Sequence, residues 1–421
     1  MTDRAPLPAD LYVSPGAPLA DAALPSVTVV ILNLNGRRHL NRCFESLAAL
    51  DYPRQKLQIF LIDNGSDDGS VEEVGSRWPQ VRVVVNARNE GFARACNQGA
   101  ALRGQSSVLA FLNNDVRVDP RWLRELVQPI ARGECASTTS KMLSWDGAAI
   151  DSAGGGMNFH GIGLQYGYKD VPGPEHDRPR RTLFACGGAM AIDAAVFQAC
   201  GGFDPEFFAY YEDVDLGWRL WVQGYEVHYT PASVCWHHHH GTSDRLPTRT
   251  LRLIQVRNPL YACFKNYDDA HLRQILPVAL ALHLRRASLA SGIERDRSFR
   301  IEDARPADQS LRPTLVQRAW ARATGRTMSL HGEATMSSIG AADLIGANDL
   351  LGRWAFWMAR RAEVQEKRRR SDQDIFRLFL RPLWCVEDDP TYRALFEGSA
   401  EFFGLDTLFD GMTTMPKDPA Q

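Results

Sequence analysis

The sequence predicts an α/β fold, with a mostly parallel sheet covered by helices on both faces and a helical C-terminal region. Over the first third of the 421 residues, short β-branched apolar runs alternate with amphipathic segments. Strands that alternate with single helices form right-handed βαβ units, and such units build parallel sheets. Past about residue 270 these runs stop, and Leu-, Ala- and charge-rich stretches predict helices.

Each predicted strand of the parallel sheet is a short apolar run with a helix after it. The strands are expected at 27–34, 57–63, 81–85 and 107–113, and the helices at 38–50, 71–77, 93–103 and 121–131. Further along, the Gly-rich segment 151–167 predicts irregular loop with short strands. Strands are then expected at 184–193 and 225–231, with a helix over 213–223 that ends at Gly224.

Composition divides the chain into a flexible Pro-rich leader (1–25), an α/β domain (26–270) and a mainly helical region (271–421). A net charge of −2 gives no argument for nucleic-acid binding. The eight cysteines are scattered and form no C-x-x-C pair, which favours reduced thiols in a cytosolic protein. Because signal-peptide and membrane-spanning patterns are missing, we expect a cytoplasmic protein, with peripheral membrane contact left open.

Polar side chains follow every predicted parallel strand. They are Asn33 and Asn35, then Asp63, Asn64, Ser66 and Asp67, then the string RNEGFARACNQG (88–99), and finally Asn113, Asn114 and Asp115. Ligands of parallel sheets bind outside the carboxyl ends of the strands. A carboxylate such as Asp63 can accept hydrogen bonds from a nucleobase or ribose, and Asp115 can hold a divalent cation that bridges a diphosphate. Each residue could instead simply make a turn, but four polar clusters at one edge favour a ligand site.

An acidic cluster opens the predicted helix that begins near residue 213. Glu212, Asp213 and Asp215 lie in its first turn, where the helix dipole alone would favour carboxylates. A carboxylate here could also act as a general base that takes a proton from an attacking hydroxyl. Asp213 is the first choice and Glu212 the second, because Asp215 is expected to face away or to pair with Arg219 four residues later.

A run of four histidines, 237–240, follows the last predicted strand. A histidine at a strand end can ligate a metal through its neutral imidazole. We expect His237 to be the ligand because it comes directly off the strand, with His239 as the alternative. An expression tag is the other explanation, although tags are normally terminal and longer.

Together these segments resemble the family 2 glycosyltransferases of the GT-A fold, most closely their rhamnosyltransferase-like branch. The resemblance is carried by VTVVILNLNG (27–36), IDNGSDDGS (62–70), NEGFARACNQG (89–99), FLNNDV (111–116), GGAMAI (187–192), GGFDPEFFAYYEDVDLGWRL (201–220) and HHHHGTS (237–243). Each segment is a weak signal alone, but the set occurs in the family's order over about half of the chain.

The resemblance implies an inverting, single-displacement transfer from a nucleoside diphosphate sugar, assisted by Mg²⁺ or Mn²⁺. The donor would be dTDP-rhamnose or a UDP-sugar, and the acceptor a hydroxyl of a saccharide or lipid-linked glycan. Asp63 would contact the base, Asn113 to Asp115 would stand for the Asp-x-Asp metal motif, Asp213 would be the base, and His237 an accessory metal ligand. The donor-binding residues implied are Asn33, Asn35, Asp63, Asn89, Gly91, Asn97, Asn113, Asn114 and Gly188.

One departure from the family motif keeps a rival hypothesis open. The first carboxylate of Asp-x-Asp is Asn113 here, so Asp115 must carry most of the metal binding, and weak metal affinity is expected. An inactive nucleotide-sugar-binding scaffold is therefore one alternative. A nucleotidyltransferase is another, but LNLNGRRHL is a poor match to the Gly-rich, basic phosphate loop that such an enzyme needs.

The helical region offers two weaker signals. The basic run RRAEVQEKRRR (360–370) is a solvated helix face or a patch that attracts anionic lipid head groups. Trp354, Phe356 and Trp357 precede it and could anchor in a membrane interface or form a helix or subunit contact. A homodimer through this region is a further hypothesis.

Overall fold

The computed structural model describes residues 7–238, 248–291, 336–381, 389–405, 408 and 413–414. Its centre is a ten-stranded mixed sheet in the order β10-β12-β6-β11-β4-β1-β2-β3, with β5 paired to β12 and β7 to β6. The strands are β1 (Val27–Asn33), β2 (Leu57–Asp63), β3 (Val81–Val85), β4 (Val108–Asn113), β5 (Val116–Val118), β6 (Ser137–Ser144), β7 (Ile150–Ser152), β10 (Arg180–Arg181), β11 (Ala189–Asp193) and β12 (Val227–His237).

Strands β4, β1, β2 and β3 form the parallel half of the sheet, as the sequence predicts. Their register places Asn33 beside Asp63 and Leu32 beside Asn113. The polar residues that follow these strands therefore meet at one edge of the sheet. This edge is where parallel sheets bind their ligands.

The other half of the sheet is mixed. Strand β11 runs antiparallel between β4 and β6, and β12 runs parallel to β6 but antiparallel to β5. The predicted last strand, 225–231, is too short, because β12 continues to His237 after a register shift between Thr230 and Val234. Pro231 lies inside this shift. A bulge accommodates a proline that a regular ladder would exclude.

Helices cover both faces of the sheet, and the alternation along β1 explains why. Val29 and Ile31 point into one hydrophobic cluster, and Val30 points into the other. The first cluster receives α1 (Arg37–Ala48), α2 (Ser70–Arg77) and α4 (Trp122–Ala131). The second receives α3 (Phe92–Ala101), α5 (Ala194–Ala199) and α6 (Glu212–Val222). These helices match the predicted ones to within two residues, apart from α5, which the sequence did not predict.

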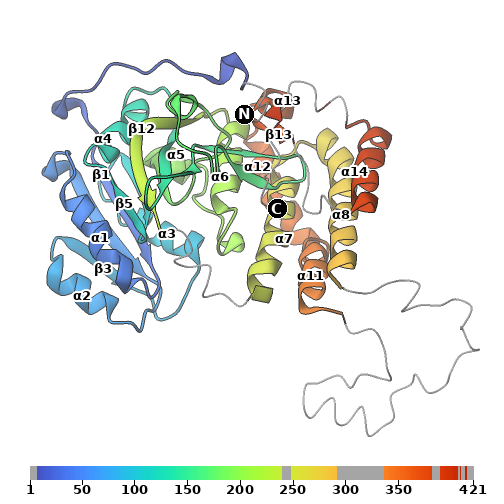
Figure 1. Cartoon of the computed structure of the whole chain (residues 1–421), viewed down its shortest axis with the longest axis horizontal. Helices are drawn as coiled ribbons and strands as arrows, with labels where there is room; N and C mark the ends of the chain where they lie inside the picture. Colours follow the sequence, from blue (N-terminus) through green and yellow to red (C-terminus); the bar gives the residue numbers. More distant parts are fainter. Residues whose placement is uncertain are drawn as a thin grey trace, which may run out of the picture.

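The helices of the C-terminal region stand together beside the α/β domain (Figure 1). They include α7 (Thr248–Asn266), α8 (Asp269–Ser291), α11 (Ser338–Gly352), α12 (Trp354–Glu366), α13 (Asp372–Ile375) and α14 (Pro390–Phe402). Their buried residues, among them Leu260 and Trp357, belong to the same hydrophobic cluster as Val30 of β1. The helices and the sheet therefore share one core, and the predicted boundary at residue 270 does not mark a break in packing.

The basic run of the helical region makes intramolecular contacts. Arg361 donates to the carbonyls of Phe264 and Tyr267, and Arg370 donates to the carbonyl of Tyr225. These bonds give the run a structural role, and its attraction to lipid head groups stays a prediction. The sequence also predicts that a polar segment near 294–312 interrupts the helices, and this segment lies outside the described residues.

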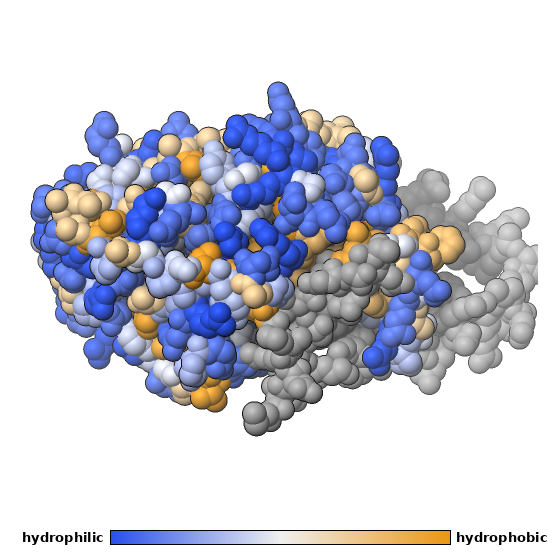
Figure 2. Space-filling model, turned by 90° about the horizontal axis from the view of Figure 1, so that it is seen from above, coloured by the Kyte–Doolittle hydropathy of each residue, from blue (hydrophilic) through white to orange (hydrophobic). Residues whose placement is uncertain are grey.

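The surface bears on the predicted membrane or subunit contact through its exposed apolar side chains. Most of the face in Figure 2 is hydrophilic, with hydrophobic residues scattered over it. On α11 and α12, however, several large apolar side chains are exposed: Ile339, Leu344, Ile345, Leu351, Trp354, Phe356 and Met358. Trp357 is buried against Tyr261 instead. Within the described parts of the chain, no helix is both long enough and apolar enough to cross a bilayer.

Residues 7–25 run along the α/β domain and make specific contacts with it. Lys56 donates to the carbonyls of Asp21, Ala22 and Leu24, and the backbone of Leu19 donates to the side chain of Gln128. The described part of the predicted leader is thus attached to the domain. Six of the seven described cysteines are buried and all seven are free, in line with the predicted reduced thiols.

Candidate active site

The carboxyl ends of β1, β2 and β4 are tied together by the side chain of Asn33. Its Nδ2 donates to Asp63 Oδ1 at 2.7 Å, and its Oδ1 accepts from Asn114 Nδ2 at 2.8 Å. Asn33 and Asp63 are completely buried, and Asn114 nearly so. A buried amide that uses both ends in hydrogen bonds fixes the relative position of its partners. Asn33 therefore joins the three strands whose ends carry the predicted site.

The Asp63 carboxylate is fully occupied by the protein. Oδ1 accepts from Asn33 and from Ser66 Oγ, and Oδ2 accepts from the backbone of Gly65 and Ser66. Asn35, which has a φ of 51°, receives a bond from Asp67 and donates to Ser66 Oγ at 2.7 Å. Asp63 thus shapes the loop on which Asn35 is presented. The predicted contact of Asp63 with a nucleobase stays a prediction.

The segment after β3 contacts this loop and the aromatic stretch before α6. Asn89 Oδ1 accepts from Asn64 Nδ2 at 3.2 Å and from the backbone of Gly91 at 2.9 Å. Gly91 has a φ of +83°, and a Cβ placed there would lie 2.6 Å from the Phe208 ring, so only glycine fits. Asn97 uses both ends of its amide on the backbone of Phe203. Asn89 and Asn97 therefore hold neighbouring segments in place.

Asn113 and Gly188 link the end of β4 to the start of β11. The backbone of Asn113 donates to the carbonyl of Gly188 at 2.9 Å. A Cβ on Gly188 would lie 3.3 Å from Asn113 Nδ2, so the glycine leaves room for that amide. Asn113 is partly exposed, unlike Asn114. Its side chain is accordingly the more accessible of the two.

Asp115 and His237 meet next to this edge. His237 Nε2 lies 3.3 Å from Asp115 Oδ1, and His237 Nδ1 lies 2.8 Å from Asp151 Oδ2. The pairing of β12 with β5 brings His237 opposite Val116, the residue after Asp115, and the backbone of His238 donates to the Asp115 carbonyl. Sheet pairing thus fixes both ligand candidates at the same point. The alternative ligand, His239, lies outside the described residues.

Electrostatics at this pair favour opposite charges. Burial alone would raise the pKa of Asp115, but the hydrogen bond and charge of His237 and the charge of His39 outweigh it and lower that pKa. Burial alone would lower the pKa of His237, but the hydrogen bonds and charges of Asp115 and Asp151 raise it to about 10. If a divalent cation displaces the proton from His237 Nε2, the carboxylate and the neutral imidazole would form a donor set for it.

The acid pair lies at the start of α6. Asp213 Oδ2 accepts from the backbone of Gly187 at 2.9 Å, and Oδ1 accepts from the backbone of Val214 at 2.8 Å. Asp213 is partly exposed, whereas Glu212 is buried and its Oε2 has no hydrogen-bond partner among the described residues. Of the two carboxylates, Asp213 is therefore the one that an incoming substrate can reach.

Both acids of the pair have raised pKa values. Burial is the main cause at Asp213, and the backbone hydrogen bonds from Gly187 and Val214 oppose it. At Glu212 burial raises the pKa well above its ordinary value, and the charge of Asp213 adds to the effect. A raised pKa makes a carboxylate a stronger base once it is ionised, which suits proton abstraction.

The third acid of the cluster, Asp215, belongs to the core. It is fully buried and accepts from Arg219 Nε at 2.8 Å, which confirms the predicted i,i+4 pair. Lys265 and Asn266 of α7 also donate to it. Asp215 therefore ties α6 to the helical region and has no free face for substrate.

A strained aromatic loop leads into the acid pair. Phe208, Tyr210 and Tyr211 all have positive φ values, between 62° and 70°, which non-glycine residues adopt rarely and at a cost. Asn258 of α7 donates through Nδ2 to the carbonyls of Phe207, Ala209 and Tyr210. The helical region thus holds the conformation of the segment that presents Asp213.

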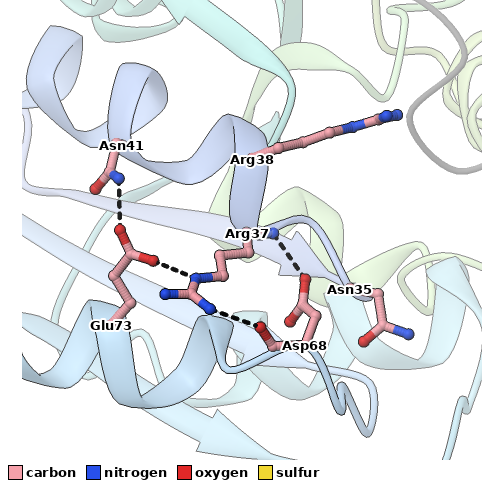
Figure 3. A pocket seen from close by; sticks show the side chains of 6 residues that line it. All are labelled: Asn35, Arg37, Arg38, Asn41, Asp68 and Glu73. Atoms are coloured by element: carbon pink, nitrogen blue, oxygen red, sulfur yellow. Dashed lines mark hydrogen bonds and ion pairs between the residues drawn. The ribbon is translucent and has the colours of Figure 1, made fainter.

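A polar cavity of about 450 Å³ opens beside Asn35, lined by Asn35, Arg37, Arg38, Asn41, Asp68 and Glu73 (Figure 3). Arg37 is held between Glu73 and Asp68, with Nε 2.6 Å from Glu73 Oε2. Arg38 points away from the other five side chains and donates to His39. Most of the charge in this cavity is consequently paired.

The predicted site residues converge at one edge of the sheet. Asp63 contacts Asn33, Asn33 contacts Asn114, and Asp115 follows Asn114 and contacts His237. On the other side, Asn113 contacts Gly188, and the preceding Gly187 contacts Asp213. A second group of side chains that could bind a metal lies where α8 and α13 begin. It consists of Asp268, His271 and Asp372. There Arg368 already pairs with Asp372.

Sequence reasoning missed Asp151 and Asn258. Asp151 was placed in a Gly-rich loop, and nothing in its neighbourhood signals that β7 brings it to His237. Asn258 did carry a signal, because an Asn between apolar residues of a helix needs a buried partner. The segment LIQVRNPLYACF is such a helix.

The α/β sheet thus carries the acid pair and the Asp–His pair at one edge. The chain belongs to the glycosyltransferase-like family 2, whose sequence model matches residues 25–255. The resemblance noted from the motifs is thereby confirmed.

The proteins similar to this chain match different shares of it and of their own length. The O-antigen biosynthesis protein RfbC of Myxococcus xanthus is 30% identical over 211 residues, 48% of this chain and 16% of that protein. The N-acetylglucosaminyl-diphospho-decaprenol L-rhamnosyltransferase of Mycobacterium tuberculosis is 28% identical over 250 residues, 53% of this chain and 79% of that protein. A crystal structure of GalNAc-T7 with UDP, GalNAc and Mn²⁺ matches with 22% identity and a TM-score of 0.49, over 61% of this chain and 51% of that one.

Proposed function

We propose that the chain transfers a sugar, with inversion, from a nucleoside diphosphate sugar to a hydroxyl of a saccharide or lipid-linked glycan, with Mg²⁺ or Mn²⁺ as cofactor. The observation that carries this proposal is the unbroken series of contacts from Asp213 through Gly187, Gly188 and Asn113 to the Asp115–His237 pair. A general base and a cation site on one sheet edge are the two parts that such a transfer needs.

Asp115 and His237 would hold the cation. Their oxygen and nitrogen face each other at 3.3 Å, and a carboxylate with an imidazole suits Mn²⁺ well. The ion would neutralise the charge that develops on the departing diphosphate. A proton and a metal ion compete for the Nε2 lone pair of His237. The single carboxylate at this point supports weak metal affinity.

Asp213 would take the proton from the acceptor hydroxyl. Its carboxylate is oriented by two backbone N–H groups and remains partly exposed, and burial raises its pKa. The aromatic residues before it, among them Tyr210 and Tyr211, would line the acceptor side. Glu212 remains the second candidate, although its burial argues for a supporting role.

The donor-binding residues would divide into two groups. Asn35, Asn89, Asn113 and Gly188 would meet the donor, because Asn35, Asn89 and Asn113 expose surface at the edge and Gly188 lies next to the accessible amide of Asn113. Asn33, Asp63, Gly91, Asn97 and Asn114 would position them, since their hydrogen bonds or close packing already hold the neighbouring segments.

The name of one relative supports a donor class and an acceptor class for this proposal. The name of the mycobacterial relative specifies a rhamnosyl group and a diphospho-decaprenol acceptor. This supports dTDP-rhamnose, with a UDP-sugar as the second candidate, and an acceptor whose saccharide is carried on a lipid. A role in cell-surface polysaccharide assembly would fit both, with the enzyme acting at the inner face of the membrane.

Turnover of a small panel of nucleotide sugars, with and without EDTA, tests this proposal. We expect release of a nucleoside diphosphate that depends on Mn²⁺ or Mg²⁺, and a product whose anomeric configuration, read by NMR, is opposite to that of the donor. Nucleotide binding without turnover of any donor would favour the scaffold. Release of pyrophosphate from a nucleoside triphosphate and a sugar phosphate, supplied in place of the donor, would favour the nucleotidyltransferase.

A further inference from the structure

We propose that Asp151 is a positioning residue of the metal site, which holds His237 so that Nε2 is presented beside Asp115. This inference rests on the proposed metal-dependent function. It assigns a role to a carboxylate in a Gly-rich segment that the sequence motifs do not mark.

The hydrogen bond to His237 carries the inference. Asp151 Oδ2 lies 2.8 Å from Nδ1, on the side of the ring opposite Nε2, which lies 3.3 Å from Asp115 Oδ1. A carboxylate that accepts from Nδ1–H fixes the tautomer and leaves the Nε2 lone pair for a cation. The same bond fixes the plane of the ring.

The sheet topology delivers Asp151 to this position from a distant part of the chain. β7 pairs with β6 with a register shift between Met142 and Leu143, and β6 in turn places Ser144 beside His237 of β12. An irregular pairing turns a side chain out of the regular alternation. The carboxylate of β7 can therefore reach across β6 to the end of β12.

Burial strengthens the influence of the Asp151–His237 hydrogen bond on the imidazole. The side chains of Asp151 and His237 are each 13% exposed, and that of Asp115 is 5% exposed. Water competes poorly at such a depth, so the negative charge of Asp151 acts on the imidazole at low dielectric and increases its strength as a ligand. If Asp151 served only the fold, it would stabilise the edge of the sheet without increasing the strength of His237 as a ligand.

Mn²⁺ affinity measured with the metal alone, for example by electron paramagnetic resonance of the free ion at one fixed pH, separates these roles. Asp151→Ala should bind Mn²⁺ about 10- to 100-fold more weakly than the native protein, as the loss of an outer carboxylate does at other sites. Asp151→Asn keeps an oxygen acceptor but loses the charge, so its affinity should be intermediate. Asp146→Ala, on the exposed turn between β6 and β7, is the matched control and should bind normally.

A double-mutant cycle with His237→Ala completes the test. If Asp151 acts through His237, replacing it in the His237→Ala background should change Mn²⁺ affinity by less than about twofold. An equal loss in both backgrounds, or native affinity for Asp151→Ala with an unchanged melting temperature, would overturn the positioning role. If the native protein itself binds no Mn²⁺ and turns over its donor in EDTA, the metal-dependent function fails instead, and the two failures are distinguishable.

Discussion

Asn258 Nδ2 lies 2.7 Å from the carbonyl oxygen of Tyr210, in the loop that leads into the acid pair. Through this bond and two more, a helix that follows the predicted histidine ligand holds the strained backbone from which Asp213 projects. The helical region thus supports the proposed catalytic site, because the positive φ angles of Tyr210 and Tyr211 need surroundings that enforce them.

Asn258→Ala should lower both stability and turnover. It leaves three loop carbonyls without their buried donor, which costs about 1–3 kcal/mol of unfolding free energy, and it frees the loop to relax from its strained conformation. Urea unfolding and kcat measure the two effects. Asn348→Ala, on the exposed face of α11, is the control and should change neither. Native kcat in a folded Asn258→Ala protein would show that the loop keeps its conformation without Asn258.

Asp213→Asn should lower kcat by about a hundredfold or more, with donor affinity nearly unchanged, because the amide keeps the shape of the side chain but cannot take a proton. Glu212→Gln is the paired variant and should retain much more activity, since that side chain is buried. Rate assays and donor titration measure these effects. The opposite ranking would transfer the base role to Glu212.

The pH profile of kcat/KM should have an acid limb above the ordinary aspartate range. Burial raises the pKa of Asp213, so the base is protonated and inactive at a pH where a surface aspartate would already be ionised. Activity therefore rises with pH through the raised pKa. The profile of Asp213→Asn should lack this limb in its residual rate, and an identical limb in that variant would point to another group.

Lys265→Met should strongly destabilise the protein. Lys265 Nζ lies 2.6 Å from Asp204 Oδ2 and 2.9 Å from Asp215 Oδ1, and all three side chains are buried. Removing one member of a buried ion pair leaves an uncompensated charge and costs about 3–5 kcal/mol. Glu45→Gln, which breaks the exposed Arg42–Glu45 pair, should cost less than about 1 kcal/mol. Urea midpoints compare the two.

The same network predicts acid sensitivity. Burial alone would raise the pKa of Asp204, but the charges of Lys265, Arg360 and Arg219 and a hydrogen bond from Lys265 outweigh it, so its pKa in the folded state is lowered. Its contribution to stability is thus present above the unfolded-state pKa of about 3.9 and is lost as the pH falls through the folded-state value. Unfolding free energy should decline below about pH 4 in the native protein, and less steeply in Asp204→Asn.

The parallel half of the fold could be predicted because each of its strand–helix units is local in sequence. The same is true of the Asp215–Arg219 pair, which needs only helical spacing. By contrast, the pairing of β7, β6 and β12 depends on the order of strands in the sheet, which periodicity does not encode. The Asp151–His237 contact therefore could not be foreseen, and neither could the extension of β12 past Pro231, where a bulge replaces the expected strand end.

The sequence predicted which polar residues lie together but not the contacts that they make. Motif order placed the polar residues at one edge, which the Asn33 and Gly187–Gly188 contacts confirm. Yet the sequence could not show that the carboxylate oxygens of Asp63 are all hydrogen-bonded within the protein, whereas Asn35 is partly exposed. Burial and hydrogen-bond occupancy decide between such neighbours, and both depend on the folded state.

A crystal of the protein with Mn²⁺ and a nucleoside diphosphate, with the metal located by its anomalous signal, tests the central claim most directly. We expect the ion between Asp115 Oδ1 and His237 Nε2, at about 2.0–2.3 Å from each, with the diphosphate on its far side and Asp213 facing the same cleft. An ion at the Asp268–His271–Asp372 cluster, or a nucleotide bound away from the ends of β1 and β4, would contradict the account.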